Sequence, residues 1–286
     1  SGPDNSFLRA MTGLEGLPTR PYEISARVRP NRIGIELADA YLAFGEHRID
    51  VDGAIAIKEG LVGTDLSVDL RGPELLNVAL LTGVPYLPNG PYEASGQVAF
   101  DRAGLVLRGA SASVGPLTAT ANGSIGLGGN LGDFDLDVSA NGPDLGSLAN
   151  FELLQRLSGQ AFAVAAKIRH SGDTYECESV EASIGQLNAF VNATISDDAS
   201  AATIAFRGTA PDAQPVSTLL GIGQLPEGAF SAEGSVEMRP GEFEFRDNRM
   251  QIGGHRFGAD GVLSATPLRN DSDLRFSAEG PDLKQL

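Results

Sequence analysis

The chain has 286 residues, of which 42% are hydrophobic and 6% aromatic, and it contains no tryptophan. Its 37 acidic and 21 basic residues give a formal net charge of −16 at pH 7, which disfavours nucleic acid as a partner and electrostatic docking to anionic membranes. The single cysteine, Cys177, excludes an internal disulfide framework, and no apolar run approaches the ~18 residues that a membrane-spanning helix needs.

A signature of Pro followed by an acid, preceded by Gly in four of its five copies, recurs along the chain at a nearly constant spacing. Its prolines at positions 3, 73, 143, 211 and 281 are separated by 70, 70, 68 and 70 residues. Apolar and turn residues between the prolines keep the same offsets, which distinguishes a repeat from the chance recurrence of loop residues. The sequence predicts one elongated body of four repeat units at 1–70, 71–140, 141–208 and 209–278, with 279–286 as the start of a further unit.

Each unit is predicted to open with a short helix, because Pro and an acid at its start and Gly after its end are typical helix punctuation. Examples are the segment 5–12, ended by Gly13, and the segment 74–82, ended by Gly83. A strictly alternating strand follows, which predicts one buried and one solvent-facing side. The apolar side of this first strand includes Tyr22, Ile24 and Val28, then Tyr92 and Val98, then Phe162 and Val164, and finally Phe230 and Val236.

The second strand of each unit is predicted to return antiparallel after a turn. In the first unit Ile35 and Leu37 are odd-numbered, whereas Ala40 and Leu42 are even-numbered. A one-residue slip would expose the core face, so this change of parity predicts a β-bulge that recurs in all four units. The inward residues near the end of the second strands are Leu42, Val114, Ile184 and Ile252.

A third and a fourth strand complete each unit, and the two-residue deletion behind the short spacing falls in the expected hairpin tip at 196–198. The predicted fold class is mostly β with short helices. Each unit is a short helix plus a four-strand antiparallel meander. Sixteen strands then form a long curved, twisted and groove-like sheet with one apolar face and one acidic face.

That apolar face must be covered, and two coverings are possible. In one, the sheet curls into a trough that the helices partly close. Burial of an acyl chain in this trough would contribute ~0.8 kcal/mol per CH₂. In the other, helices and neighbouring units close the core, and the chain is a scaffold or protein-binding solenoid. The candidate lipid-contact residues are Tyr22, Ile24, Val28, Leu42, Tyr92, Val98, Val114, Phe162, Val164, Ile184, Phe230, Val236 and Ile252.

Few residues suggest catalysis or metal binding. His47, His170 and His255 are too scattered for a catalytic triad or a zinc site, and Cys177 occupies a core position of the repeat. The alternating acids of segment 133–137 are interpreted as a solvated strand face rather than a calcium site. We therefore expect no enzyme, no cofactor and no metal.

The unit also resembles a known family. Gly-Pro-Asp-Leu, a short helix, Leu-Pro-x-x-Pro-Tyr opening a strand, a turn such as Ser113-Val114-Gly115 and a closing strand such as 135–139 together resemble the repeat region of AsmA-like proteins. The TamB and YhdP relatives of Gram-negative bacteria belong to this family. The resemblance spans the whole chain, although a helix in every unit departs from the family pattern.

The resemblance implies a periplasmic bridge, anchored in the inner membrane by an N-terminal helix outside this segment. Its repeating β-groove would shield phospholipid tails and so support phospholipid transport and outer-membrane integrity. The expected partners are phospholipid or another acyl-chain lipid, further units of the same chain and envelope proteins. Because the chain begins and ends inside a Gly-Pro-Asp signature, we expect it to be a piece of a longer protein. The alternative is a periplasmic scaffold with a closed core and no lipid path.

Overall fold

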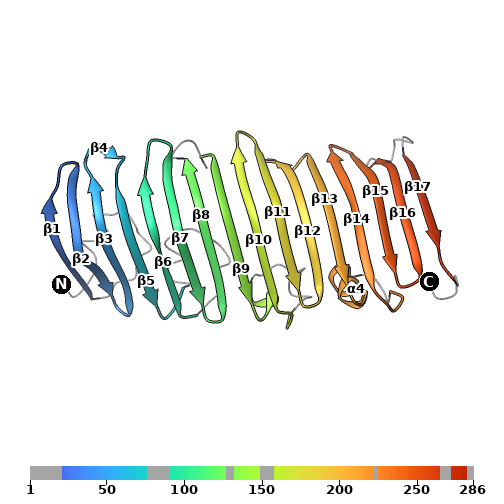
Figure 1. Cartoon of the computed structure of the whole chain (residues 1–286), viewed down its shortest axis with the longest axis horizontal. Helices are drawn as coiled ribbons and strands as arrows, with labels where there is room; N and C mark the ends of the chain where they lie inside the picture. The colour runs from blue at the N-terminus through green and yellow to red at the C-terminus, as the bar shows by residue number, and fades with distance from the viewer. Residues whose placement is uncertain are drawn as a thin grey trace. The chain divides into compact units, whose positions relative to one another are not determined.

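A computed structural model describes residues 21–75, 90–126, 132–148, 158–221, 225–264 and 272–281. Sixteen antiparallel strands form one open sheet in sequence order from β1 to β17, with β4 left out (Figure 1). The prediction of a mostly β antiparallel meander is therefore confirmed. The chain divides into two compact units. Unit 1 comprises Ser1–Gly132, Ala140–Gly142 and Ser147–Asn150, and unit 2 comprises Asp133–Ser139, Pro143–Gly146 and Phe151–Leu286.

The first strand of each predicted repeat is present with the expected alternation. In β6, for example, buried or half-buried residues alternate with exposed ones along most of the strand. The alternation follows from the extended backbone, which directs successive side chains to opposite faces. The four strands are β1 (Tyr22–Pro30), β6 (Tyr92–Phe100), β10 (Phe162–Ser171) and β14 (Phe230–Arg239).

The second strands are β2 (Gly34–Phe44), β7 (Gly104–Val114), β11 (Thr174–Ile184) and β15 (Glu242–Ile252). Each shifts register against the third strand in mid-strand, where the parity of the apolar residues changes. One residue at each shift has a positive φ, and these residues are Asp39, Gly109, Ser179 and Asp247. The predicted β-bulge is confirmed in all four places.

The third strands are β3 (His47–Ala56), β8 (Leu117–Gly126), β12 (Leu187–Ser196) and β16 (His255–Ser264). The fourth strands are β5 (Asp65–Gly72), β9 (Phe134–Gly142), β13 (Ala202–Ala210) and β17 (Asp273–Glu279). The shortened loop at 197–201 is the hairpin tip between β12 and β13, as predicted. A four-residue strand, β4 (Lys58–Leu61), lies between β3 and β5 and was not predicted.

The expected helices are described only in part. In the fourth repeat, α4 (Gln214–Leu220) has Pro in its first turn and ends at Gly221, whose φ of 64° is left-handed. In the third repeat, the described segment forms one turn of 3-10 helix, η1 (Leu145–Leu148). Gly146 inside this turn lowers its α-helical propensity. The helices expected at 5–12 and 74–82 lie outside the described residues, apart from residues 74–75, so a helix in every unit is not established.

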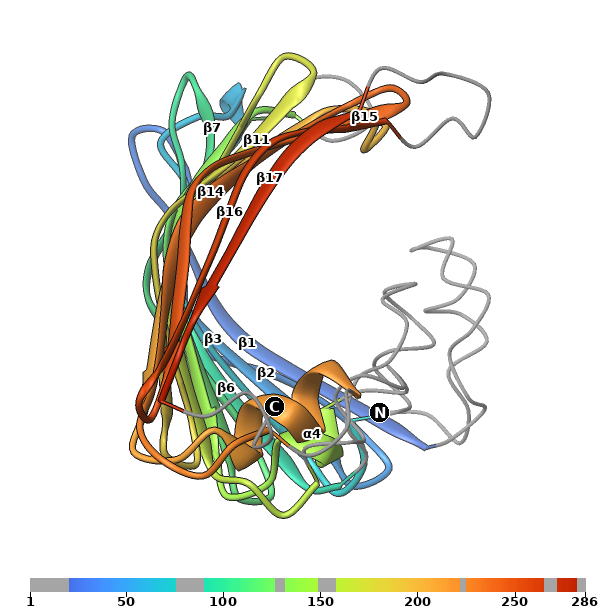
Figure 2. The same ribbon diagram turned by 90° about the vertical axis from the view of Figure 1, so that its right-hand side faces the viewer.

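The sheet does not curl closed, because β1 and β17 each pair with one neighbouring strand only within the described chain. The open sheet is the coarser part of the prediction, and the trough along it stays a prediction. In unit 2, strands β14, β16 and β17 are bent, and α4 lies on their concave side (Figure 2). Ala213 and Val216 at this helix pack with Phe230 and Ile252 in the core of unit 2.

Candidate functional site

Two neighbouring cross-strand rows form the apolar face of unit 2 beside α4. The first row runs across β12 to β16 as Ala189, Gly208, Ala232, Met250 and Phe257. The second row contains Val191, Phe206, Gly234, Ala259 and Phe276. Small residues stand beside large ones in both rows, so the large side chains surround a hollow of about 450 Å³.

The helix α4 and the segment after it close one end of this hollow. Val216 is 5% exposed, and Leu225 packs against the same core. Val216 and Leu225 line the hollow and also pack in or against the core, so these two residues form the wall between the hollow and the core. The apolar core therefore ends in an open hollow.

The other side of the hollow is open to solvent. Phe206, Met250 and Phe257 are only half-buried, and Phe276 on β17 is 68% exposed. Fully burying a side chain of this size would stabilise the protein by ~1.5–3 kcal/mol. Clustered apolar surface that the fold leaves uncovered is typical of a binding site.

The predicted lipid-contact residues of unit 1 lie in several environments. Tyr92 is buried, whereas Ile24 and Val28 on the edge strand β1 are 49% and 52% exposed. The remaining residues of this set are half-buried, and they are Tyr22, Leu42, Val98 and Val114. Tyr92 is opposite Val114 at the end of the β6–β7 pair.

In unit 2 the predicted lipid-contact residues are divided between buried and half-buried positions. Phe162, Phe230 and Ile252 are 6%, 7% and 1% exposed. The physical reason for Phe230 and Ile252 is that α4 covers them. Half-buried positions are occupied by Val164, Ile184 and Val236. Of these six residues, Phe230 alone lines the hollow.

The main residues of the hollow, Phe206, Met250, Phe257 and Phe276, were not selected from the sequence. Their inward orientation follows from strand alternation. Their special feature is the pairing with small residues: Met250 is opposite Ala232, and Phe206 is opposite Gly234. A small inward residue such as Ala232, which also lines the hollow, is a signal that could have pointed to them, whereas the space over Gly234 is taken by Asn248.

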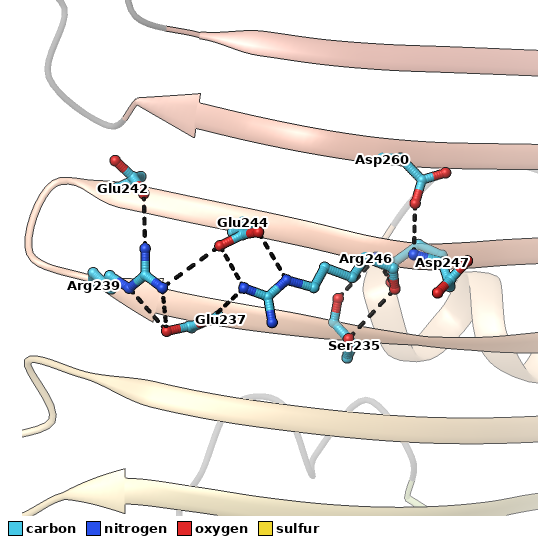
Figure 3. Close-up of polar contacts among 9 residues, drawn as sticks. Ser235, Glu237, Arg239, Glu242, Glu244, Arg246, Asp247 and Asp260 are labelled. Carbon is cyan, nitrogen blue, oxygen red and sulfur yellow. Dashed lines mark hydrogen bonds and ion pairs between the residues drawn. The ribbon is translucent and has the colours of Figure 1, made fainter.

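The polar face of unit 2 carries a network of charges on β14 and β15 (Figure 3). Arg246 contacts Glu244 at 2.8 Å and Glu237 at 3.1 Å, and Arg239 contacts Glu237 at 2.6 Å. The hydrogen bond from Arg246 lowers the pKa of Glu244. The acidic face is therefore partly neutralised by its own arginines.

The buried histidines His47 and His170 contact neighbouring side chains of the sheet. His47 stacks on Phe44 with ring centroids 5.0 Å apart, and its Nδ1 lies 3.2 Å from the Tyr92 hydroxyl. The Nε2 of His170 lies 3.1 Å from Asp197 Oδ1. Among the described residues, no group of three His, Cys, Asp or Glu side chains is placed to hold a metal ion.

The alternating acids of β9 also have local partners. Asp135 is 3.3 Å from Lys167 and 3.4 Å from Arg169. Burial raises the pKa of the Cys177 thiol, which favours its protonated form. The ion pairs of Asp135 with Lys167 and Arg169 connect β9 to β10.

Within the ranges that the structure describes, no helix has the length and apolar character to cross a membrane. Comparisons of the chain with protein-family models, with curated protein sequences and with solved structures gave no match. The functional interpretation of the hollow therefore depends on its own geometry and chemistry.

Proposed function

We propose that the hollow of unit 2 binds an acyl chain of a phospholipid or a similar lipid, without catalysis. The observation that carries this proposal is a hollow of about 450 Å³ lined by half-buried and exposed apolar side chains, with α4 at one end. Charged residues that border it, such as Arg207 and Arg249, occupy strand positions of the opposite alternation.

The energetics favour a hydrocarbon ligand. About ten buried CH₂ groups would contribute ~8 kcal/mol before the cost of association. The lining is mostly apolar apart from Asn248 and the bordering charged residues, so a polar ligand would lose more hydration on entry than it regains in hydrogen bonds. An acyl chain has no such loss, and its headgroup can remain in water outside the hollow.

The resemblance to the AsmA-like repeat region extends the proposal to the protein's place in the cell. On this view the chain is a periplasmic segment of a longer protein that is anchored in the inner membrane. Four repeat units and further units beyond them would shield acyl chains between the membranes and support outer-membrane integrity. The repeated antiparallel architecture is compatible with this role.

One observation favours the alternative of a scaffold with a closed core. Tyr92, Phe162 and Phe230, which share one position of the repeat, are all at least nine-tenths buried. If the same packing covered the whole apolar face in the complete protein, the chain would be a periplasmic scaffold or a protein-binding solenoid. The experiment below separates the two functions.

The test is displacement of a fluorescent fatty acid from the full chain, with Met250→Glu and Gln251→Glu as matched variants. The two residues are neighbours on β15 that face opposite sides, and only Met250 lines the hollow. We expect Met250→Glu to weaken binding at least about tenfold, because it places a charge among apolar groups. Gln251→Glu should bind as the wild type does.

Ala232→Leu serves as an uncharged second variant, because its larger side chain fills the floor of the hollow. Circular dichroism and a urea titration confirm that each variant is folded. The proposal is contradicted if the folded wild type binds no fatty acid. Equal binding by Met250→Glu and Gln251→Glu would also contradict it.

A further inference from the structure

The polar face of unit 2 has a hollow of its own, of about 390 Å³, which we call the arginine pocket. Most residues that line it occupy strand positions that alternate with those of the apolar hollow, so it lies on the other side of the sheet. One cross-strand row of its lining contains Arg207, Glu233 and Arg249. The neighbouring row contains Thr209, Ser231, Gln251 and Arg256.

The lining of the arginine pocket is positively charged in an acidic protein. It contains three arginines and one glutamate, which give a formal charge of +2, whereas the whole chain has a net charge of −16. The charges that line a recess act together on a small ligand. The arginine pocket is therefore suited to an anion.

Two of the arginines have only distant ion-pair partners. Arg207 is 3.8 Å from Glu233, and Arg249 is 3.6 Å from Asp247. A charge-assisted hydrogen bond between such groups is ~2.7–2.9 Å long. The side chains of Arg207 and Arg249 are 72% and 71% exposed. Their guanidinium N–H groups are therefore available to a ligand.

Other arginines on the same face are paired more closely. Arg246, also on β15, is 2.8 Å from Glu244. Arg256 is opposite Glu279 across β16 and β17, but it forms no ion pair with any residue that the structure describes. The arginine pocket thus differs from the adjoining charge network, in which acids neutralise the arginines.

Unit 1 has a hollow of the same size, about 390 Å³, at the same place of the repeat. Its lining includes three acids, one arginine and several serines and threonines. The residues of unit 1 at the positions of Arg207, Arg249 and Arg256 are Asp69, Ser111 and Thr118. The fold therefore forms this hollow without the three arginines, so its shape does not explain their presence.

We propose that the arginine pocket binds the phosphate group of a small soluble molecule. The planar fork of a guanidinium group matches two oxygens of a phosphate, and a phosphate monoester carries a charge of about −2 at pH 7. The hydroxyls of Thr209 and Ser231 and the amide of Gln251 are neutral donors for further oxygens. A volume of about 390 Å³ falls in the ~300–1,000 Å³ range of small-molecule sites.

A phosphate group is also part of a phospholipid headgroup at a membrane surface. The net charge of −16 repels an anionic bilayer, whereas a small solute can enter the local positive field of the arginine pocket. We therefore assign the phosphate to a soluble molecule. This assignment is independent of acyl-chain binding, because the two hollows lie on opposite faces of the sheet.

The test follows the arginine Nε–H resonances of the full chain by NMR during titration with inorganic phosphate. Sodium chloride at equal ionic strength is the control salt. The variant Arg249→Ser with Arg256→Thr introduces the residues that unit 1 has at these positions. The matched control, Arg102→Thr with Arg108→Ser, removes the same charge from unit 1, and neither of its residues lines the arginine pocket.

We expect phosphate to cause saturable shifts at Arg207, Arg249 and Arg256 in the wild type. Binding measured at Arg207 should weaken at least about tenfold in the Arg249→Ser, Arg256→Thr variant, because two charged donors are lost, and should change little in the control. Wild-type shifts that do not saturate, or that chloride reproduces, would overturn the proposal. Equal weakening in both variants would overturn it as well.

Phosphatidic acid in phosphatidylcholine vesicles distinguishes the two sources of the phosphate group. Flotation of the full chain with these vesicles, without saturable binding of inorganic phosphate, would overturn the proposal in favour of a membrane surface. We expect inorganic phosphate to bind and the chain to remain separate from the vesicles.

Discussion

The backbone N–H of Asp247 donates a hydrogen bond to Oδ1 of Asp260 at 2.5 Å (Figure 3). Asp247 is the bulge residue of β15, and Asp260 lies on the neighbouring strand β16. The same bond recurs from Asp39 to Asp52 at 2.7 Å, from Gly109 to Asn122 at 2.6 Å and from Ser179 to Asn192 at 2.8 Å. A bulge removes its extra residue from the strand ladder, and in each repeat an Asp or Asn side chain supplies the missing acceptor.

The variant Asp260→Ala should therefore lower the free energy of unfolding by ~1 kcal/mol, because the bulge N–H of Asp247 loses its acceptor. Asp260→Asn is the matched control, since Asn122 and Asn192 accept the same bond in their repeats. Urea denaturation measures both variants. A loss of equal size in the Asn variant would show that the hydrogen bond is not the cause.

Gly72 is predicted to tolerate no side chain. A Cβ atom at this position would overlap Nδ1 of His47 and lie 2.8 Å from Cε1 of Tyr92. Gly72→Ala should lower the free energy of unfolding by ~1–3 kcal/mol, because two buried rings must shift. At Gly208 the nearest atom to a new Cβ is Cε1 of Phe230, at 3.7 Å, so Gly208→Ala is the control. Thermal unfolding compares the two, and equal midpoints would refute the close packing around His47.

Asp198 at the tip of the β12–β13 hairpin should titrate at unusually low pH. Its carboxylate accepts hydrogen bonds from the Ser200 backbone at 3.0 Å and from the Ser196 hydroxyl at 2.8 Å. These bonds, with Ser200 the larger contributor, lower its pKa from 3.8 to about 2. A folded-state pKa below the unfolded value means that the unfolded chain binds the proton first as the pH falls.

The stabilising contribution of Asp198 is therefore complete above pH ~4 and is lost as the pH falls toward about 2. Carbon-detected NMR of the Asp198 carboxyl group measures the titration directly. We expect a midpoint of about 2 in the wild type and a higher midpoint in Ser196→Ala, which lacks one donor. A wild-type midpoint at the ordinary value of 3.8 would contradict the hydrogen-bonded tip.

The strands and bulges could be predicted because they depend on local alternation. The parity change between Leu37 and Ala40 is visible in the sequence, and the register shift occurs between these two residues. The acceptors of the bulge N–H groups could not be predicted in the same way. Asp52 is distant from Asp39 along the chain, and the strand register must be known before the two can be placed together.

The hollow was harder to predict than the sheet. Alternation identifies Phe206 and Met250 as inward, but it does not distinguish an inward residue in the core from one beside open space. That difference depends on Ala232 on the paired strand and on the position of α4. The edge strand β17 raises the same difficulty, because exposure of Phe276 follows from the absence of a described neighbour rather than from its own sequence.

The most direct test of acyl-chain binding is native mass spectrometry, with lipid extraction, of the full chain purified from a bacterial host. We predict that about one phospholipid per chain co-purifies with the wild type and with Gln251→Glu, and that Met250→Glu carries none, because its charge opposes entry of an apolar chain. A wild type that is folded, monomeric and free of lipid would contradict the proposed binding and favour a scaffold.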